Sequence, residues 1–337
     1  MDKLAHIEKL LEQIRSSEGD TFAYDEDKIQ EVYEKQGANT SSLAIKILSI
    51  LGGFLAMLAF LGFLAITGLY DSAIGLLLFG LGFIVASIAL NKAFDKLIFD
   101  TFSISLYILG FVLFIIGLFQ WDIEENTVTL LTGILALVVL LITQNYVLLF
   151  LSVLIFNGSL LTLIISNDAY ELVHFYIAIN AFMLAYLLLN EAKIISSYKK
   201  LAKLYNPLRI GLIMSLLFGL MAIGKRGLLP VSQDYIWLSS IVLILIVAYI
   251  THIIAGIHKI QTLKTKIIIY SLVGLLLLST VFSPAILGAL LILLLCFLVN
   301  YKTGLVIGII ALVYFVSQYY YDLSFTLLTK SIPVSYT

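Results

Sequence analysis

Long apolar segments follow one another along the chain from Leu43 to Tyr321, and each is about as long as a bilayer is thick. The polar seams between them are short. Within each segment the apolar positions are continuous rather than alternating, which predicts helices and not the strands of a membrane barrel. In hydrocarbon only a helix or a closed barrel satisfies all of its backbone hydrogen bonds. The pattern therefore predicts an all-α fold, a polytopic transmembrane helical bundle.

The segments predict about eleven spans, within a range of ten to twelve. The expected spans cover residues 44–69, 72–90, 98–119, 127–143, 146–165, 171–189, 207–223, 235–257, 267–283, 285–300 and 303–320.

Two long apolar stretches need to be divided. Only Gln144 and Asn145 interrupt residues 127–165, and one helix of that length would rise about 58 Å against about 30 Å of hydrocarbon. This stretch is therefore expected to be a hairpin. Residues 267–300 divide at Pro284, because proline breaks a helix pattern. Its two short legs either cross the bilayer twice or form a re-entrant pair.

The pattern divides the chain into three parts: a soluble segment over 1–42, a transmembrane domain over 43–321 and a short tail over 322–337. In the first part four apolar residues recur at helical spacing among charged ones, which predicts an amphipathic cytoplasmic helix: Leu4, Ile7, Leu11 and Ile14. The first part has no apolar signal region, so we expect the first span to direct insertion.

Basic residues predict the orientation. With the amino terminus in the cytoplasm, most lysines and arginines of the spanning domain fall on inner seams, namely Lys92, Lys96, Lys193, Lys199, Lys200, Lys203, Arg209, Lys259, Lys264, Lys266 and Lys302. The outer seams and the tail hold Lys225, Arg226 and Lys330. This asymmetry follows the positive-inside rule and places the carboxyl terminus outside.

Composition narrows the classes of function. With 61% hydrophobic residues, 12% charged residues and a mean hydropathy of +1.07, the chain is not a soluble domain. The net charge of −1 argues against a nucleic-acid partner. One cysteine, Cys296, and four histidines argue against a disulfide framework and a transition-metal site. Without a catalytic or nucleotide-binding motif, we expect no enzyme and no cofactor.

Asn157 and Asn180 are the most informative polar residues. Each lies about 14 Å from the seam between their two predicted spans, near the bilayer centre, and Tyr176 lies one turn before Asn180. Amides at this depth are costly without partners. Two explanations remain: an Asn–Asn hydrogen bond that holds neighbouring antiparallel helices together, or a lining for a solute path.

Four ionisable residues also fall within the predicted spans. Lys46 and Asp100 lie near the inner ends of the first and third spans, where they either reach the interface or pair with each other. Glu171 and His174 are three residues apart near the outer end of the sixth span. They form either an interfacial pair or a proton-handling pair.

Small residues mark two expected helix-packing faces. Gly304 and Gly308 form a GxxxG pattern in the last span, and Gly52 with Gly53 opens a flat face on the first. Glycine lets helix backbones approach closely, so both faces are expected to pack against other helices.

Two segments, residues 47–56 and 319–331, resemble a bacterial membrane family catalogued as domain of unknown function 4401. The resemblance implies a bacterial inner-membrane location and association with membrane proteins that bear a GDYxxLxY motif. It assigns no catalytic residues. Relatives continue after Lys330 and Ser331 with a further apolar helix, so the tail 322–337 is expected to be a truncated part of it.

Three functions are consistent with these observations. The first is a non-catalytic component of the inner membrane that assembles with another membrane protein through residues 4–14. The second is a transporter for a small organic solute that uses polar residues at the bilayer midplane. The third, a membrane-embedded enzyme, lacks clustered carboxylates or histidines to support it. The sequence does not specify the substrate, the partner or the oligomeric state.

Overall fold

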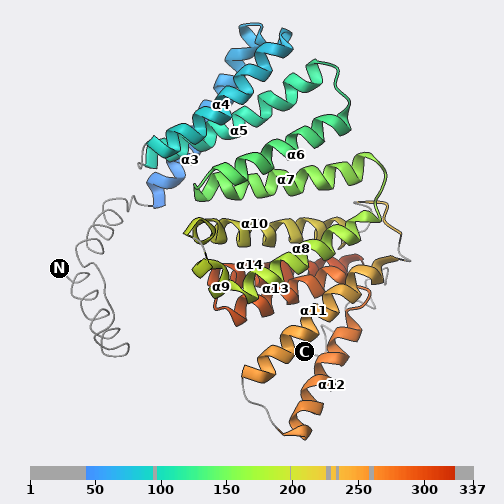
Figure 1. Cartoon of the computed structure of the whole chain (residues 1–337). Helices are drawn as coiled ribbons and strands as arrows, with labels where there is room; N and C mark the ends of the chain where they lie inside the picture. Colours follow the sequence, from blue (N-terminus) through green and yellow to red (C-terminus); the bar gives the residue numbers. More distant parts are fainter. Residues whose placement is uncertain are drawn as a thin grey trace, which may run out of the picture.

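The computed structural model describes residues 43–93, 97–197, 199–224, 229–232, 235–257 and 262–322. Within these ranges the chain forms helices and turns and no β-strand (Figure 1). The amphipathic residues 4–14, the tail after 322 and the pair Lys225–Arg226 lie outside the described residues.

The helices follow the predicted segments closely. They are α3 (Leu43–Ile66), the short 3-10 helix η1 (Leu69–Asp71), α4 (Ala73–Ala93), α5 (Leu97–Gln120), α6 (Glu125–Ile142), α7 (Tyr146–Ser166), α8 (Leu172–Leu189), α9 (Glu191–Ser197), α10 (Lys199–Gly224), α11 (Ile236–Ile257), α12 (Leu263–Ser279), α13 (Pro284–Leu298) and α14 (Lys302–Asp322). Eight of them are long and apolar enough to cross a membrane: α4, most of α5, α6, α7, α8, most of α10, α11 and most of α14. The all-helical prediction is confirmed.

Local chemistry explains where several helices begin and end. Asn145 caps α7, because its side-chain oxygen accepts hydrogen bonds from the backbone N–H groups of Val147 (2.8 Å) and Leu148 (3.1 Å). Pro284 opens α13, where a missing N–H costs nothing. Asn300, just after α13, has φ +54°, the left-handed conformation that commonly ends a helix.

One boundary differs clearly from the prediction. The seventh span was expected to begin at residue 207, but α10 begins at Lys199 and contains Pro207 in its interior. Membrane helices tolerate an internal proline when neighbouring groups satisfy the backbone. Helix α10 is therefore 26 residues long. The expected seam 190–206 becomes the short helix α9 and the first two turns of α10.

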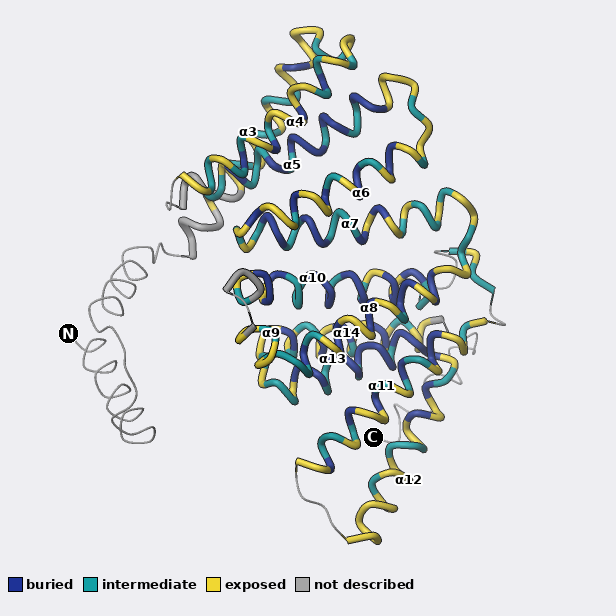
Figure 2. The backbone as a smooth tube through the Cα atoms, viewed as in Figure 1, coloured by how far each residue is buried: buried dark blue, intermediate teal, exposed yellow. Residues whose placement is uncertain are grey.

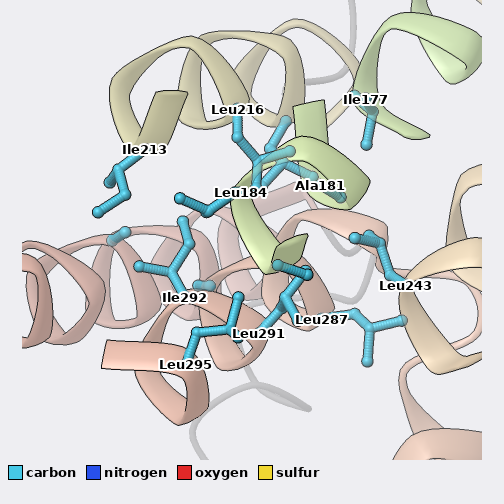
Figure 3. Packing of buried hydrophobic residues seen from close by; sticks show 14 of the residues in the cluster. Ile177, Ala181, Leu184, Ile213, Leu216, Leu243, Leu287, Leu291, Ile292 and Leu295 are labelled. Carbon is cyan, nitrogen blue, oxygen red and sulfur yellow. The ribbon is translucent and has the colours of Figure 1, made fainter. Parts of the chain in front are cut away.

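The helices form two groups, each with its own buried core. Helices α3–α7 share three small apolar clusters, whereas α8, α10, α11, α13 and α14 surround one large cluster. Figure 3 shows that large cluster, in which Leu184 of α8, Leu216 of α10 and Leu291 of α13 converge. In Figure 2 buried residues gather where α8, α10 and α13 lie together, and they also run along α5 and α7 of the first group.

Helix α13 runs antiparallel to α10 through the large core. A Cβ at Gly224, the last residue of α10, would lie 2.8 Å from Ala285 at the start of α13. At the other end the ring of Tyr301, just after α13, lies 3.7 Å from Arg209 near the start of α10. Among the described helices α12 packs mainly against α11; it adds Leu277 to the large cluster and is otherwise mostly exposed (Figure 2).

The two groups meet mainly where α7 packs against α10. At Gly211 a Cβ would lie 2.7 Å from Val153, so the missing side chain lets the two helices approach. Helices α7 and α8 are consecutive in sequence but contact each other little, because α10 packs against both (Figure 1). This arrangement differs from the close antiparallel packing of spans five and six that an Asn157–Asn180 hydrogen bond would need, and it leaves space between α7 and α8.

Candidate functional site

A cavity of about 1030 Å³ lies between α7 and α8, with α10 as its floor. It reaches from Asn167 and Ala169, in the turn between α7 and α8, to Ile194 of α9. Leu208 and Leu212 of α10 form part of its floor. We refer to this cavity as the α7–α8 groove. Its walls are mostly apolar side chains.

Both predicted amides line the α7–α8 groove. Asn157 comes from α7 and Asn180 from α8, and both side chains are buried, with exposed fractions of 7% and 3%. The structure therefore brings the two residues to one cavity from helices on opposite sides of it.

The two amides do not bond to each other. Asn157 Nδ2 donates to the carbonyl oxygen of Val153, and Asn180 Nδ2 donates to that of Tyr176, both at 3.0 Å and within their own helices. Among the described residues nothing donates to either side-chain oxygen. Neither oxygen belongs to the fully buried, unpartnered atoms, so both remain accessible in the groove.

Tyr176 joins the groove to its floor. Its hydroxyl donates to the backbone carbonyl of Ser215 in α10 at 3.2 Å. Its ring lies over Gly219, where a Cβ would come within 2.8 Å of Tyr176 Cε1. Glycine at 219 therefore makes the close contact between α8 and α10 possible.

Glu171 and His174 lie at the amino-terminal end of the same helix, near α11. His174 Nδ1 is 2.8 Å from Ser239 Oγ, and His174 Nε2 is 3.5 Å from Glu171 Oε2. Glu171 also accepts a hydrogen bond from the backbone N–H of Ser232 at 3.0 Å. The histidine is buried and the carboxylate is exposed. Through these contacts the pair joins α8, α11 and the 229–232 segment.

The other predicted residues are dispersed. Asp100 accepts a hydrogen bond from Asn91 at 2.8 Å, while the side chain of Lys46 lies outside the described part of the chain. A Cβ at Gly308 would lie 3.3 Å from Ile292 of α13, and one at Gly304 would meet Cys296. A Cβ at Gly53 would lie 2.8 Å from Ser105 of α5, whereas one at Gly52 would have nothing within 4 Å.

The interpretation of the sequence missed a partly buried cation. Arg209 was assigned to an inner seam, but it lies inside α10 with 15% of its side chain exposed. Its Nη1 is 3.4 Å from Glu191 Oε1 of α9, and its guanidinium carbon lies 3.7 Å from the centre of the Tyr301 ring. A second ring, that of Tyr205, lies 5.1 Å away. Burial raises the pKa of the Tyr301 hydroxyl, and the neighbouring Arg209 opposes this shift.

A signal for this cluster was present in the sequence. Arg209 lies within the predicted span 207–223. An arginine within a membrane helix is costly unless it is paired. Counting Arg209 among the residues of the inner seam hid this signal. Among the described residues no group of three or more histidine, cysteine, aspartate or glutamate side chains could hold a metal ion.

The long apolar helices define the class of this chain: it is an α-helical integral membrane protein. A family model described as Domain of unknown function (DUF4401) matches residues 42–334, so the chain belongs to this family. The resemblance noted in the sequence is thereby confirmed. Neither the curated proteins nor the solved structures contain a match to the chain.

Proposed function

We propose that this protein transports a small organic solute and holds it in the α7–α8 groove. The observation that carries the proposal is that one cavity joins Asn157 and Asn180, two buried amides with unoccupied carbonyl oxygens. A mostly apolar cavity with a few convergent polar groups is the usual form of a small-molecule site. A pair that only held two helices together would have used those oxygens for each other.

The proposal includes a topology. We propose eleven crossings, with the amino terminus in the cytoplasm and the carboxyl terminus in the periplasm of a bacterial inner membrane. The distribution of lysine and arginine supports this orientation. The alternating course of α10, α13 and α14 supports counting the short helix α13 as a crossing, since Arg209 lies near one of its ends and Gly224 near the other.

The test compares three forms of the protein in proteoliposomes. Vesicles are incubated with a bacterial metabolite extract, washed and analysed by mass spectrometry. We expect wild-type vesicles to accumulate at least one compound that vesicles with N157L/N180L do not. The matched control is N190L, because Asn190 makes the same bond to its own helix (2.9 Å, to Tyr186) but does not line the α7–α8 groove. Identical contents in all three vesicle types would refute the proposal.

A second candidate function is assembly with another membrane protein. Five large residues of α8 are exposed at spacings of three and four, as in a coiled-coil seam: Leu172, Phe175, Ile179, Phe182 and Tyr186. A transmembrane helix of a partner would fit such a stripe. Phe182 separates the two functions, since it does not line the α7–α8 groove. A photocrosslinker at Phe182 that captures one defined membrane protein, with transport unchanged in F182A, would support assembly.

A further inference from the structure

We infer that the ligand of the α7–α8 groove is a long-chain amphiphile with one hydroxyl donor, which enters sideways from the bilayer. This inference rests on the proposed function and specifies its substrate class. Three observations carry it: the chemistry of the walls, the side on which the groove opens, and the unoccupied amide oxygens.

The walls exclude charged ligands. Among the described residues that line the groove there is no aspartate, glutamate, lysine, arginine or histidine. A charged solute would lose its hydration without a compensating partner, which costs several kcal/mol or more. An alkyl chain would lose no hydrogen bonds there and would keep its dispersion contacts with the apolar walls.

The groove opens toward lipid rather than toward water. Phe175, Ile179 and Met183 line it and are also exposed on the outer surface of α8, with exposed fractions of 66%, 42% and 50%. These residues belong to a helix that is long and apolar enough to cross the membrane. A ligand dissolved in the hydrocarbon therefore reaches the groove without crossing an aqueous interface.

The size of the groove favours a chain over a compact metabolite. Its volume of about 1030 Å³ lies at the upper limit of the roughly 300–1,000 Å³ of small-molecule pockets. From Leu172 to Leu187 it follows α8 for about 22 Å, most of the roughly 30 Å of hydrocarbon. Asn180 lies about 12 Å from the start of α8, so the polar contacts lie at half depth.

The amides select for a donor. Each has one N–H bonded to its own helix, and each side-chain oxygen accepts no bond from a described residue. A hydroxyl of the ligand donates to such an oxygen, whereas an ether of the same length can only accept from the second N–H of an amide and leaves the amide oxygen unpaired. In a low-dielectric site the missing bond leaves a desolvated acceptor, and this difference discriminates between the two ligands.

The experiment uses the full-length protein in lipid nanodiscs and radiolabelled 1-dodecanol as the probe, read by scintillation proximity. Unlabelled 1-dodecanol should displace the label, and dodecyl methyl ether should compete at least ten times more weakly. The displaceable signal should be lost in N157L/N180L and kept in N190L. Circular dichroism and gel filtration establish that the variants are folded, and the alcohol-to-ether comparison on wild-type protein is independent of any variant.

The outcomes separate this inference from the proposed function. Equal competition by ether and alcohol, or no displaceable binding to wild-type protein, overturns the amphiphile assignment. If a charged or strongly hydrated compound accumulates in proteoliposomes in an Asn157- and Asn180-dependent way while 1-dodecanol does not bind, transport stands and the substrate class is wrong. If N157L/N180L changes neither assay, both the inference and the proposed function fall.

Discussion

Asn157 and Asn180 are energetically separate, although they line one cavity. Each amide donates to a carbonyl of its own helix, so replacing one of them leaves the bond of the other intact. The structure thus changes the expectation of a mutual amide pair, which would have coupled the two positions strongly.

We expect the stability effects of N157L and N180L to add, with a coupling free energy below about 0.5 kcal/mol. The measurement is a double-mutant cycle in mixed detergent micelles, with unfolding by SDS followed through the two tryptophans, Trp121 and Trp237. A coupling above about 1 kcal/mol, of the size of a direct hydrogen bond, would show that the two side chains bond to each other.

Gly219 is a second residue at which a small change should have a large effect. In G219A the new Cβ would lie 2.8 Å from Tyr176 Cε1, so α8 and α10 must separate or the buried ring must rotate. We expect a loss of about 1–3 kcal/mol, as for other overpacked cores. The control is G158A in α7, where nothing lies within 4 Å of the new Cβ. There the better helix propensity of alanine should leave stability unchanged or slightly raised.

At the scale of elements, an ion pair joins the short helix α9 to α10. Glu191 begins α9, and its carboxylate is 3.4 Å from Arg209, which the Tyr301 ring covers on one face. Ile194 of the same helix closes one end of the α7–α8 groove. The ion pair and the ring therefore help to fix the position of a groove wall.

The contribution of the Tyr301 ring can be measured directly. We expect Y301L to destabilise the protein by about 1–2 kcal/mol, the size of a desolvated cation–π contact, because the ring lies 3.7 Å from the guanidinium carbon. Y301F keeps the ring and should stay within about 0.5 kcal/mol of wild type, since substitutions that keep the buried contact have small effects. If the two variants lose equal stability, the hydroxyl and not the ring makes the contribution.

The sequence predicted the helices well because hydrocarbon thickness determines their length. Asn145 and Pro284 ended apolar runs by local chemistry that can be read from the sequence, a side-chain cap and a missing N–H. The predicted span 207–223 began eight residues after the start of α10 at Lys199, because a membrane helix can contain an internal proline and a polar first part. The packing of α10 against both α7 and α8 could not be predicted from the sequence. The order of helices along the chain does not show whether a later helix separates two consecutive ones.

The same distinction applies to the candidate site. Asn157, Asn180 and Tyr176 were found because polar residues at membrane depth are conspicuous in the sequence. The groove between α7 and α8 was not found from the sequence, because it results from the packing of α10 against both helices. The burial of Arg209 depends in turn on Tyr301, which follows it by more than ninety residues.

At the scale of the whole molecule, the orientation in the membrane can be tested with single cysteines. In a C296S background, D71C and E124C should react with an impermeant maleimide in intact cells, whereas Q144C and S196C should react only after the membrane is opened. The asymmetry of basic residues is the physical reason. Reaction of S196C in intact cells would overturn the proposed topology, because Ser196 lies on the predicted inner side.

The interface between α7 and α10 has a mechanical consequence. It is the main contact between the two helix groups among the described elements, and glycine at 211 lets α7 and α10 approach each other closely there. Two packed helices with a small residue at their contact can slide past each other with small side-chain rearrangements, as in shear motions. A ligand in the α7–α8 groove touches both groups at once and would act as a wedge against such sliding. A bound ligand would then reduce the relative motion of the two helix groups without changing the shape of either group.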